Sequence, residues 1–443
     1  MALNTFNEVV NYLDSFSYSD KSKAPGIIRE NRLERMENLL KWIKNPEKDL
    51  KIIHLAGSKG KGSTATYLAI LLKNKGYKTG LYLSPHVSDY RERFTLAGRF
   101  FDDDFLIETA NLLKNLLIGF TNPAEYGSPL PSTFEIYTAY AYLLFKESGC
   151  THAVIETGIG GRLDATNTTN SIASVILPIE LEHTSILGDT IEKIAYEKSK
   201  IIKEHQVVFS ASQATEALNV IKTEAVNNNS KFYYFDDEII NFHSETLIKG
   251  EHLKFQLKAG SSFDLQLSVF GRKQAENIAL AILIASKLNF LTACGINELQ
   301  RIIIKGRFMP LKINNVPVVI DVAHTKNSIL STASTFYSIY KNDVTVIFGA
   351  LEGKDVTHML ETLISNFDNL IISQPGTFKK SNIEDIYSSA LKLNTEKNIL
   401  LIKDNKDALD TALKLNKPIL ITGSFYLAGP MLDIMEEHYG IKC

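Results

Sequence analysis

Cysteine is scarce in this chain, with three residues among 443: Cys150, Cys294 and Cys443. They are far apart and odd in number, which argues against a disulfide framework. The same spacing argues against a zinc site, whose ligands come in closely spaced groups. A reducing cytoplasm is therefore the expected location.

An excess of charge of either sign is also absent. The chain has 48 lysines and arginines against 50 aspartates and glutamates, and it contains no basic block. Nucleic acid is therefore not expected as a partner. No apolar run approaches the length of a membrane span, and Met1 to Asp14 lacks the basic start and apolar core of a signal peptide. We expect no membrane partner, and a length of 443 residues predicts two or three domains.

The most informative segment is a glycine-rich turn, in the sequence IIHLAGSKGKGST at residues 52–64. Glycines let backbone N–H groups approach phosphate oxygens, and the N-terminus of a following helix adds partial positive charge. Lys61 can reach the outer phosphates, and Ser63 or Thr64 can place a hydroxyl on Mg²⁺. Leu55 replaces the first glycine of the standard phosphate loop, so the motif is a shortened variant. A strand before the turn and a helix after it favour a nucleotide site over a surface turn.

Strand-like and helix-like segments alternate along the chain, which predicts an α/β fold with a mainly parallel sheet covered by helices. The pattern becomes alternating and turn-rich from Phe232 to Val269, which predicts a small antiparallel patch. The first strands are expected at Lys51–Ala56, Thr79–Leu83, Ala153–Thr157, Ala173–Ile179 and Val207–Ser210. The main helices are expected at Ala65–Lys73, Thr133–Phe145, Thr190–Lys203 and Gln274–Leu288.

A second alternation begins after Arg307 and predicts a smaller, Rossmann-like α/β domain. The helical pattern breaks near Ile304–Pro310, so we place an ATP-binding domain at residues 1–304 and a second domain at 305–443. The strands of the second domain are expected at Val318–Ala323, Val344–Ala350, Asn369–Ser373, Ile399–Lys403 and Pro418–Thr422.

Polar residues follow three expected strands, at the edge where open parallel sheets bind ligands. Glu156 is placed to hold a metal ion bound to nucleotide phosphates, and three glycines follow it. His183 is expected on a neighbouring strand end in register with Glu156, and Ser84 can supply a second metal hydroxyl. The alternatives are a solvated carboxylate, a structural histidine and a Ser-Pro turn.

Lys198 lies on the apolar stripe of the helix expected at 190–203, together with Ile191, Ile194, Ala195, Ile201 and Ile202. A lysine at a core-facing position must extend its charge to solvent, pair with a carboxylate, or change its chemistry. Extension to solvent is the default from periodicity alone. A carbamylated lysine would instead carry a carboxylate that can approach Mg²⁺.

Three further residues lie near the expected domain junction. Arg307 could reach across a cleft to the γ-phosphate and neutralise charge during transfer. Asp321 and His324 end the strand Val318–Ala323 and would face the same cleft. The alternatives are a linker charge in solvent and two capping residues.

Together these motifs resemble the folylpolyglutamate synthase and dihydrofolate synthase family of the Mur ligase superfamily. The resemblance runs from about Pro25 to Gly429, with the motifs in the order of the family. They are HLAGSKGKGST at 54–64, LSPHVSDYRERF at 83–94, STFEIYTAYAY at 132–142, ETGIGGRLDATN at 156–167, EHTSILGDTIEKIAYEKSKIIK at 182–203, GRKQAENIALA at 271–281, KGR at 305–307, DVAH at 321–324 and GSFYLAG at 423–429.

The resemblance implies an ATP-dependent ligase that adds L-glutamate to dihydropteroate, to reduced folates, or to both, through an acyl phosphate. It implies ATP, two Mg²⁺ ions, a carbamylated Lys198, small-molecule partners only, and a monomer. The residues implied in catalysis are Lys61, Lys198, Arg307 and His324. Those implied in ATP binding are Gly57, Gly60, Lys61, Gly62, Ser63, Thr64, Asn277, Arg307 and Asp321. The implied metal ligands are Ser63, Ser84, Glu156 and His183, and the implied substrate contacts are Arg162, Leu163, Asp164, Ala165 and Ser424.

Some positions depart from the family pattern. Val322, Thr325 and Lys326 replace a glycine, an asparagine and a proline, and Glu182 replaces an aspartate. These departures motivate one alternative, a non-catalytic or respecialised ATP-binding protein of the Mur ligase type. A peptidoglycan-type Mur ligase is disfavoured, because such enzymes carry a nucleotide-sugar domain before the phosphate loop. Here the residues before His54 have a helical pattern.

Overall fold

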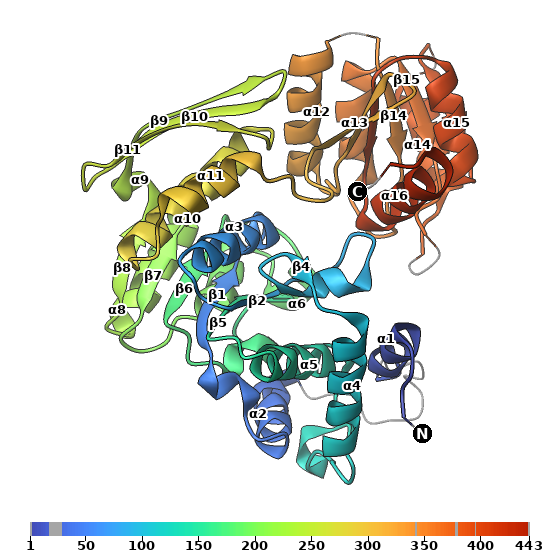
Figure 1. The fold of residues 1–443 in the computed structure, drawn as a ribbon. Helices are drawn as coiled ribbons and strands as arrows, with labels where there is room; N and C mark the ends of the chain where they lie inside the picture. The colour runs from blue at the N-terminus through green and yellow to red at the C-terminus, as the bar shows by residue number, and fades with distance from the viewer. Residues whose placement is uncertain (1, 17–28, 342, 377–379, 395, 442–443) are drawn as a thin grey trace.

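The computed structural model describes residues 2–16, 29–341, 343–376, 380–394 and 396–441. Met1, Pro25 and Cys443, which the sequence analysis used, lie outside the described residues. Two α/β units follow one another along the chain, and a separate three-stranded sheet packs beside helices α10 and α12 (Figure 1). The α/β class and the second, smaller unit are confirmed. No helix among the described residues is long and apolar enough to cross a membrane.

The first unit is built on an eight-stranded sheet in the order β4-β3-β2-β5-β1-β6-β7-β8. Six neighbouring strands, β2-β5-β1-β6-β7-β8, run parallel to one another, and β3 and β4 add an antiparallel edge. Apart from Lys51, the inner strands β2, β5, β1 and β6 are buried on both faces and are therefore mostly apolar, whereas the edge strand β8 is partly exposed. The strands are β1 (Lys51–Ala56), β2 (Thr79–Tyr82), β3 (Phe94–Leu96), β4 (Arg99–Phe100), β5 (His152–Glu156), β6 (Ala173–Ile176), β7 (Val207–Ser210) and β8 (Lys231–Tyr234).

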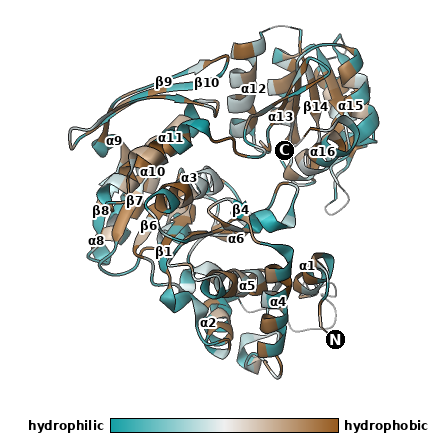
Figure 2. Ribbon diagram, viewed as in Figure 1, coloured by the Kyte–Doolittle hydropathy of each residue, from teal (hydrophilic) through white to brown (hydrophobic). Residues whose placement is uncertain are grey.

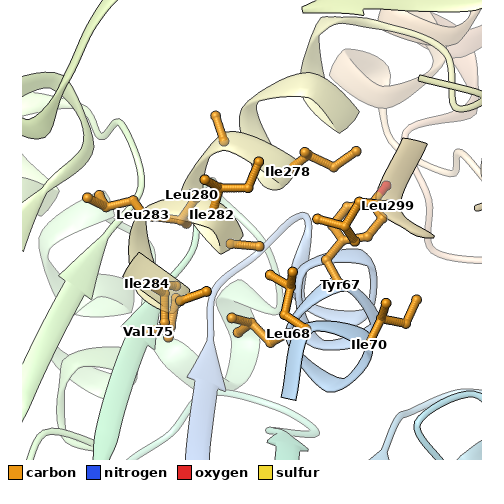
Figure 3. Close-up of a cluster of buried hydrophobic side chains, with 14 of the residues drawn as sticks. Tyr67, Leu68, Ile70, Val175, Ile278, Leu280, Ile282, Leu283, Ile284 and Leu299 are labelled. Atoms are coloured by element: carbon orange, nitrogen blue, oxygen red, sulfur yellow. The ribbon is translucent and has the colours of Figure 1, made fainter. Parts of the chain in front are cut away.

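Successive residues of β1 serve different cores, as the period of a strand requires. Ile53 and Leu55 pack with α3, α10 and α11, whereas Ile52 packs with the helices α1, α2, α4 and α5 of the opposite face. Figure 3 shows α10 packed against Tyr67, Leu68 and other residues of α3. The helices of this unit are α1 (Phe6–Asp14), α2 (Arg32–Trp42), α3 (Lys61–Asn74), α4 (Asp103–Leu116), α5 (Thr133–Glu147), α6 (Thr184–Leu187), α7 (Ile191–Ser199), α8 (Thr215–Asn227), α9 (Phe235–Glu238), α10 (Arg272–Lys287) and α11 (Ala293–Arg301).

The antiparallel patch is confirmed but begins later than expected. The three strands are β9 (Ile239–Leu247), β10 (Gly250–Leu257) and β11 (Ser262–Leu267), in the order β11-β10-β9. The residues expected at its start belong instead to β8, because that segment pairs in parallel with β7. The helix expected at 190–203 is also shorter and ends as α7 at Ser199, although Ile201 and Ile202 remain buried.

The second unit has a six-stranded sheet in the order β12-β13-β17-β14-β15-β16, in which only β12 is antiparallel to its neighbour. The sequence analysis missed β12, which occupies part of the expected boundary segment. The strands are β12 (Met309–Ile313), β13 (Val316–Ile320), β14 (Thr345–Phe348), β15 (Asn369–Ile372), β16 (Asn398–Leu401) and β17 (Ile419–Thr422). The helices are α12 (Lys326–Tyr340), α13 (Val356–Asn366), α14 (Ile383–Leu393), α15 (Asn405–Lys414) and α16 (Phe425–Tyr439).

Helices α12, α13 and α14 cover one face of this sheet, and α15 and α16 cover the other. Figure 2 shows hydrophobic residues along strands such as β7 and β14, between helices whose colours are mixed. Each unit therefore has its own core. The carboxyl ends of β1, β5 and β13 lead into the loops described next.

Candidate active site

The phosphate loop joins β1 to α3 and is held closely on both sides. Gly60 precedes α3 with a φ of 85°, in the left-handed region that favours glycine. A Cβ at Gly60 would lie 2.7 Å from the side-chain oxygen of Asn277 on α10. A Cβ at Gly57 would lie 2.5 Å from Cβ of Leu177. The two glycines therefore let the loop pack closely against Leu177 and Asn277.

Lys61 and Glu156 converge at the end of this loop. The Nζ of Lys61 donates to the carbonyl of Gly57 at 3.0 Å and lies 3.8 Å from Oε1 of Glu156. Oε2 of Glu156 accepts the backbone N–H of Ser84 at 3.1 Å. Burial raises the pKa of the Glu156 carboxyl, and Lys61 partly offsets that rise. The Lys61 ammonium, expected to bind phosphate, and the Glu156 carboxylate, expected to bind a metal ion, thus lie next to each other.

All four expected metal ligands line one cavity of about 600 Å³: Ser63, Ser84, Glu156 and His183. Thr64 does not line it and is fully buried, with its hydroxyl unpaired. The expectation that Glu156 and His183 follow neighbouring strands is wrong, because β1 lies between β5 and β6. His183 is exposed and has a positive φ of 47°.

This ligand set is mostly oxygen, which suits Mg²⁺. It includes only one carboxylate, and the described residues contain no group of three or more His, Cys, Asp or Glu side chains arranged to hold a metal ion. Mg²⁺ also keeps waters and phosphate oxygens in its coordination shell. The donors therefore fit a magnesium ion that arrives with a nucleotide.

Lys198 is 1% exposed and lies behind the phosphate loop, on the core-facing side that its apolar stripe predicted. The default expectation that its charge extends to solvent is wrong, because Lys198 finds acceptors at its buried position instead. Its Nζ donates to Oε1 of Glu182 at 2.8 Å and to the carbonyl of Gly57 at 2.9 Å. Burial lowers the pKa of Lys198 to about 8, although Glu182 favours the charged form. The sequence analysis missed the role of Glu182, but a buried lysine requires a carboxylate, and this requirement could have identified it.

The second unit contributes Arg307 and Asp321 to the cavity. The Asp321 carboxylate accepts the N–H of Phe308 at 2.8 Å, the N–H of Ala323 at 2.8 Å and the hydroxyl of Thr332 at 3.0 Å. These bonds fix the turn that carries Arg307, so Asp321 orients that turn. Burial lowers the pKa of the Arg307 guanidinium, and Asp321 partly offsets this effect.

His324 lines the same cavity in a neutral form. Its Nδ1 lies 2.9 Å from the carbonyl of Val322, which can only accept, so Nδ1 carries the proton and Nε2 is an acceptor. Burial lowers the pKa of His324 to about 3. Asn277 and Ser424 also line the cavity, and the Ser424 hydroxyl accepts the N–H of Tyr426 at the start of α16.

The loop expected to contact substrate, residues 162–165, does not line this cavity. The Asp164 carboxylate accepts the N–H groups of Gly158 and Ile159 at 3.0 and 3.1 Å, so it shapes its own loop. Arg162 pairs with Glu197 on α7 at 3.0 Å. The substrate role of these residues stays a prediction.

Two family models match the chain. The Mur ligase middle domain matches residues 109–285, and the Mur ligase glutamate ligase domain matches residues 306–425. The dihydrofolate synthase/folylpolyglutamate synthase of Bacillus subtilis is 32% identical over 404 residues, which cover 89% of this chain and 92% of that relative. The chain belongs to the dihydrofolate synthase/folylpolyglutamate synthase family.

Solved structures of folylpolyglutamate synthases share this fold. The Mycobacterium tuberculosis enzyme complexed with ADP aligns with a TM-score of 0.88 at 25% identity and covers 98% of both chains. A folylpolyglutamate synthase complex with AMPPCP and folate aligns with a TM-score of 0.79 at 26% identity, covering 98% of this chain and all of that one. In this member of the folylpolyglutamate synthase family, Glu156 lies in the part that matches the middle domain and Arg307 in the part that matches the glutamate ligase domain, whereas the phosphate loop precedes both.

Proposed function

We propose that this chain is an ATP-dependent ligase that joins L-glutamate to dihydropteroate, to reduced folates, or to both. The observation that carries the proposal is one cavity lined by Lys61 and Glu156 from the first unit and by Arg307 and His324 from the second. Membership of the family and the nucleotide and folate complexes of its relatives support the same activity.

The first chemical step is phosphoryl transfer. A carboxylate oxygen of the acceptor attacks the γ-phosphorus of ATP, the bond to the β-phosphate oxygen breaks, and ADP and an acyl phosphate result. Charge moves onto oxygens during this transfer, so positioned cations lower its barrier. Lys61 is placed to contact the phosphates from the loop, and Arg307 from the opposite wall.

Amide formation follows. The amine of glutamate attacks the acyl carbon, phosphate leaves, and the attacking nitrogen loses a proton. The departing phosphate is a stronger base than His324, whose pKa is about 3, so the phosphate takes that proton. The neutral His324 lines the cavity and is an acceptor at Nε2 for an N–H of the amine. An acyl phosphate hydrolyses in water, so enclosure by the two units protects it.

We further propose that two Mg²⁺ ions act at this site and that Ser63, Ser84, Glu156 and His183 hold them. When bound, magnesium neutralises phosphate charge and orients the reacting oxygens. We also propose that Lys198 is carbamylated in the active enzyme, which would add a carboxylate beside the phosphate loop. The domain boundary near 304–305, a monomer and a cytoplasmic location stay predictions.

The function is tested by phosphate release from ATP with Mg²⁺, L-glutamate and either dihydropteroate or tetrahydrofolate. We expect release to require glutamate and at least one acceptor, and to stop when EDTA removes Mg²⁺. Lys61→Ala should lower the rate by about 10² or more, in the range found when one preorganised donor is removed. Comparison of the two acceptors reveals whether one or both activities are present.

Lys73→Ala is the matched control, because Lys73 lies on the same helix but away from the loop. Its Nζ lies 2.5 Å from Oε1 of Glu298. Its rate should stay near that of the parent. ATP binding without glutamate-dependent phosphate release would reject the ligase and select the non-catalytic alternative. A folded Lys61→Ala variant with the parent's rate would reject the phosphate-loop assignment.

A further inference from the structure

Glu92 fixes the shape of the segment that follows β2, residues 83–89, here called the Ser84 loop. Glu92 lies on the short helical turn Tyr90–Arg93 directly after the loop. Its Oε2 accepts the N–H of Val87 at 2.6 Å, and its Oε1 accepts the N–H groups of Ser88 and Asp89 at 3.3 and 3.1 Å. One carboxylate therefore binds three successive backbone donors of the loop.

Lys305 connects this arrangement to the second unit. Its Nζ donates to the hydroxyl of Ser88 at 2.9 Å and lies 3.4 Å from Oε1 of Glu92. Lys305 stands two positions before Arg307, and the Arg307 N–H donates to the carbonyl of Ile304 at 3.1 Å. The ion pair thus links the Ser84 loop to the turn that carries Arg307.

The Ser84 loop is also seated directly against the second unit. Val87 packs with the core beneath α15 and α16. A Cβ at Gly429 on α16 would lie 2.3 Å from the carbonyl of Val87, so the helix and the loop are in close contact. A Cβ at Gly306 would meet Val322 at 2.9 Å and Val87 at 3.3 Å. Figure 1 shows the light-blue segment near β4 extending toward α16.

One end of the Ser84 loop therefore contacts Glu156 in the first unit, and the other end contacts Lys305 beside Arg307. Ser84 binds Glu156 through its backbone N–H, and Lys305 leads into Arg307. Neither Glu92 nor Lys305 lines the cavity, whereas Arg307 does. Any effect of the ion pair on the reaction must therefore act through Arg307 or the loop.

We propose that Glu92 and Lys305 are positioning residues that hold Arg307 at the distance from the phosphate loop that phosphoryl transfer requires. This inference rests on the ligase function proposed above. The contact of Arg307 with the transferring group strengthens as charge shifts in the transition state, so its misplacement lowers kcat more than it raises KM for ATP.

The central variant is Lys305→Met, which removes the charge and keeps most of the side-chain volume. We expect kcat to fall about tenfold, since small misplacements of a reacting group cost up to about 10² in rate. KM for ATP should change by no more than about twofold, because ground-state binding is retained. Lys305→Arg should restore most of the rate, because it keeps the cation that binds Glu92. Glu92→Gln should lower kcat in the same way.

A double-mutant cycle separates positioning from general stability. If Lys305 acts through Arg307, then Lys305→Met should slow an Arg307→Lys enzyme by less than about twofold, because coupled sites are not additive. Lys287→Met is the matched control. Lys287 forms an ion pair with Glu238 at 2.6 Å, and this pair is about as exposed as the pair of Lys305 and Glu92. It should leave kcat unchanged.

Three results would overturn the inference: an unchanged kcat in Lys305→Met, an equal loss in the Arg307→Lys background, or a loss that Lys305→Arg does not restore. If Lys305→Met does not fold, Ser88→Ala removes the hydroxyl between the two residues and should lower kcat in part. An unchanged kcat in Ser88→Ala would then count against the inference. Absence of glutamate-dependent phosphate release in the parent enzyme would instead reject the proposed function.

Discussion

Lys198 carries an amine into a buried position where two acceptors surround it, Glu182 and the Gly57 carbonyl. Its pKa of about 8 leaves about a tenth of the amine uncharged at pH 7, far more than for an ordinary lysine, and only an uncharged amine reacts with CO₂. Glu182 replaces the usual aspartate of the family, and its longer side chain reaches Lys198. The structure shows the amine in a salt bridge, and the carbamate is the alternative state that we propose.

At the residue scale, replacement of Lys198 distinguishes these two states. Lys198→Arg keeps a cation but cannot form the lysine carbamate, so we expect it to lose nearly all activity, as should Lys198→Ala. Acetate should partly restore the alanine variant by supplying a carboxylate in the vacated space. Phosphate release and the intact mass of the protein with and without added CO₂ measure the two effects.

Lys200→Ala is the control, since Lys200 lies at the end of the same helix but away from the loop. Its Nζ lies 2.7 Å from Oε2 of Glu224. It should keep the parent's rate. An active Lys198→Arg enzyme would show that a cation suffices and would reject the carbamate.

At the element scale, helix α16 is adapted to its neighbours at two adjacent positions. Pro430 has no N–H for the carbonyl of Tyr426, and Gly376 donates to that carbonyl instead at 2.7 Å. Gly429 has no side chain, which lets the Val87 carbonyl approach. A tertiary contact therefore compensates for Pro430, and another requires the glycine at 429.

Gly429→Ala should destabilise the protein, although alanine in a helix is usually better than glycine by about 0.5–1 kcal/mol. The added methyl would overlap the Val87 carbonyl, and overpacking of this kind costs about 1–3 kcal/mol. We expect a lower Tm and a lower kcat. Calorimetry and phosphate release measure both.

Glu436→Ala on the exposed side of α16 provides the comparison and should leave both quantities near the parent values. A higher Tm in Gly429→Ala, with normal kcat, would show that the Ser84 loop does not press on this helix.

At the scale of the whole molecule, the two units share one binding cavity, and each contributes residues to its walls. Lys61 and Glu156 belong to the first sheet unit, and Arg307, Asp321 and His324 belong to the second. A ligand that contacts both walls stabilises each unit and also the position of one unit relative to the other. In the proposed reaction, both walls enclose the acyl phosphate and limit its contact with water.

A non-hydrolysable ATP analogue with Mg²⁺ should therefore protect both units from hydrogen exchange. At a concentration of 100 times Kd, binding adds about 2.7 kcal/mol of stability. We expect slower exchange in the phosphate loop, residues 57–64, and in the turn at 304–308. Lys61→Ala should lose both effects at the same analogue concentration. Protection confined to the first unit would show that the nucleotide does not reach Arg307.

Much of the site was predictable because its signals are local. A glycine-rich turn between a strand and a helix predicts a phosphate site from local sequence alone. The strands β1 and β7 have the expected bounds. The apolar stripe around Lys198 also predicted its core-facing position, because helix periodicity decides which side chains share a face. Periodicity did not predict that the amine itself is buried. These features depend on residues only a few positions apart.

Only the tertiary structure decided which distant residues meet. The insertion of β1 between β5 and β6 separates the strands that Glu156 and His183 follow, although both side chains line the same cavity. No local pattern records the order of strands in a sheet. Asp321 orients the Arg307 turn, and Lys305 meets Glu92, through contacts between segments far apart in sequence. By itself the sequence determined the elements, their periodicity and the chemistry at their ends. Packing of the two units determined the partners, because those contacts form only when both cores are complete.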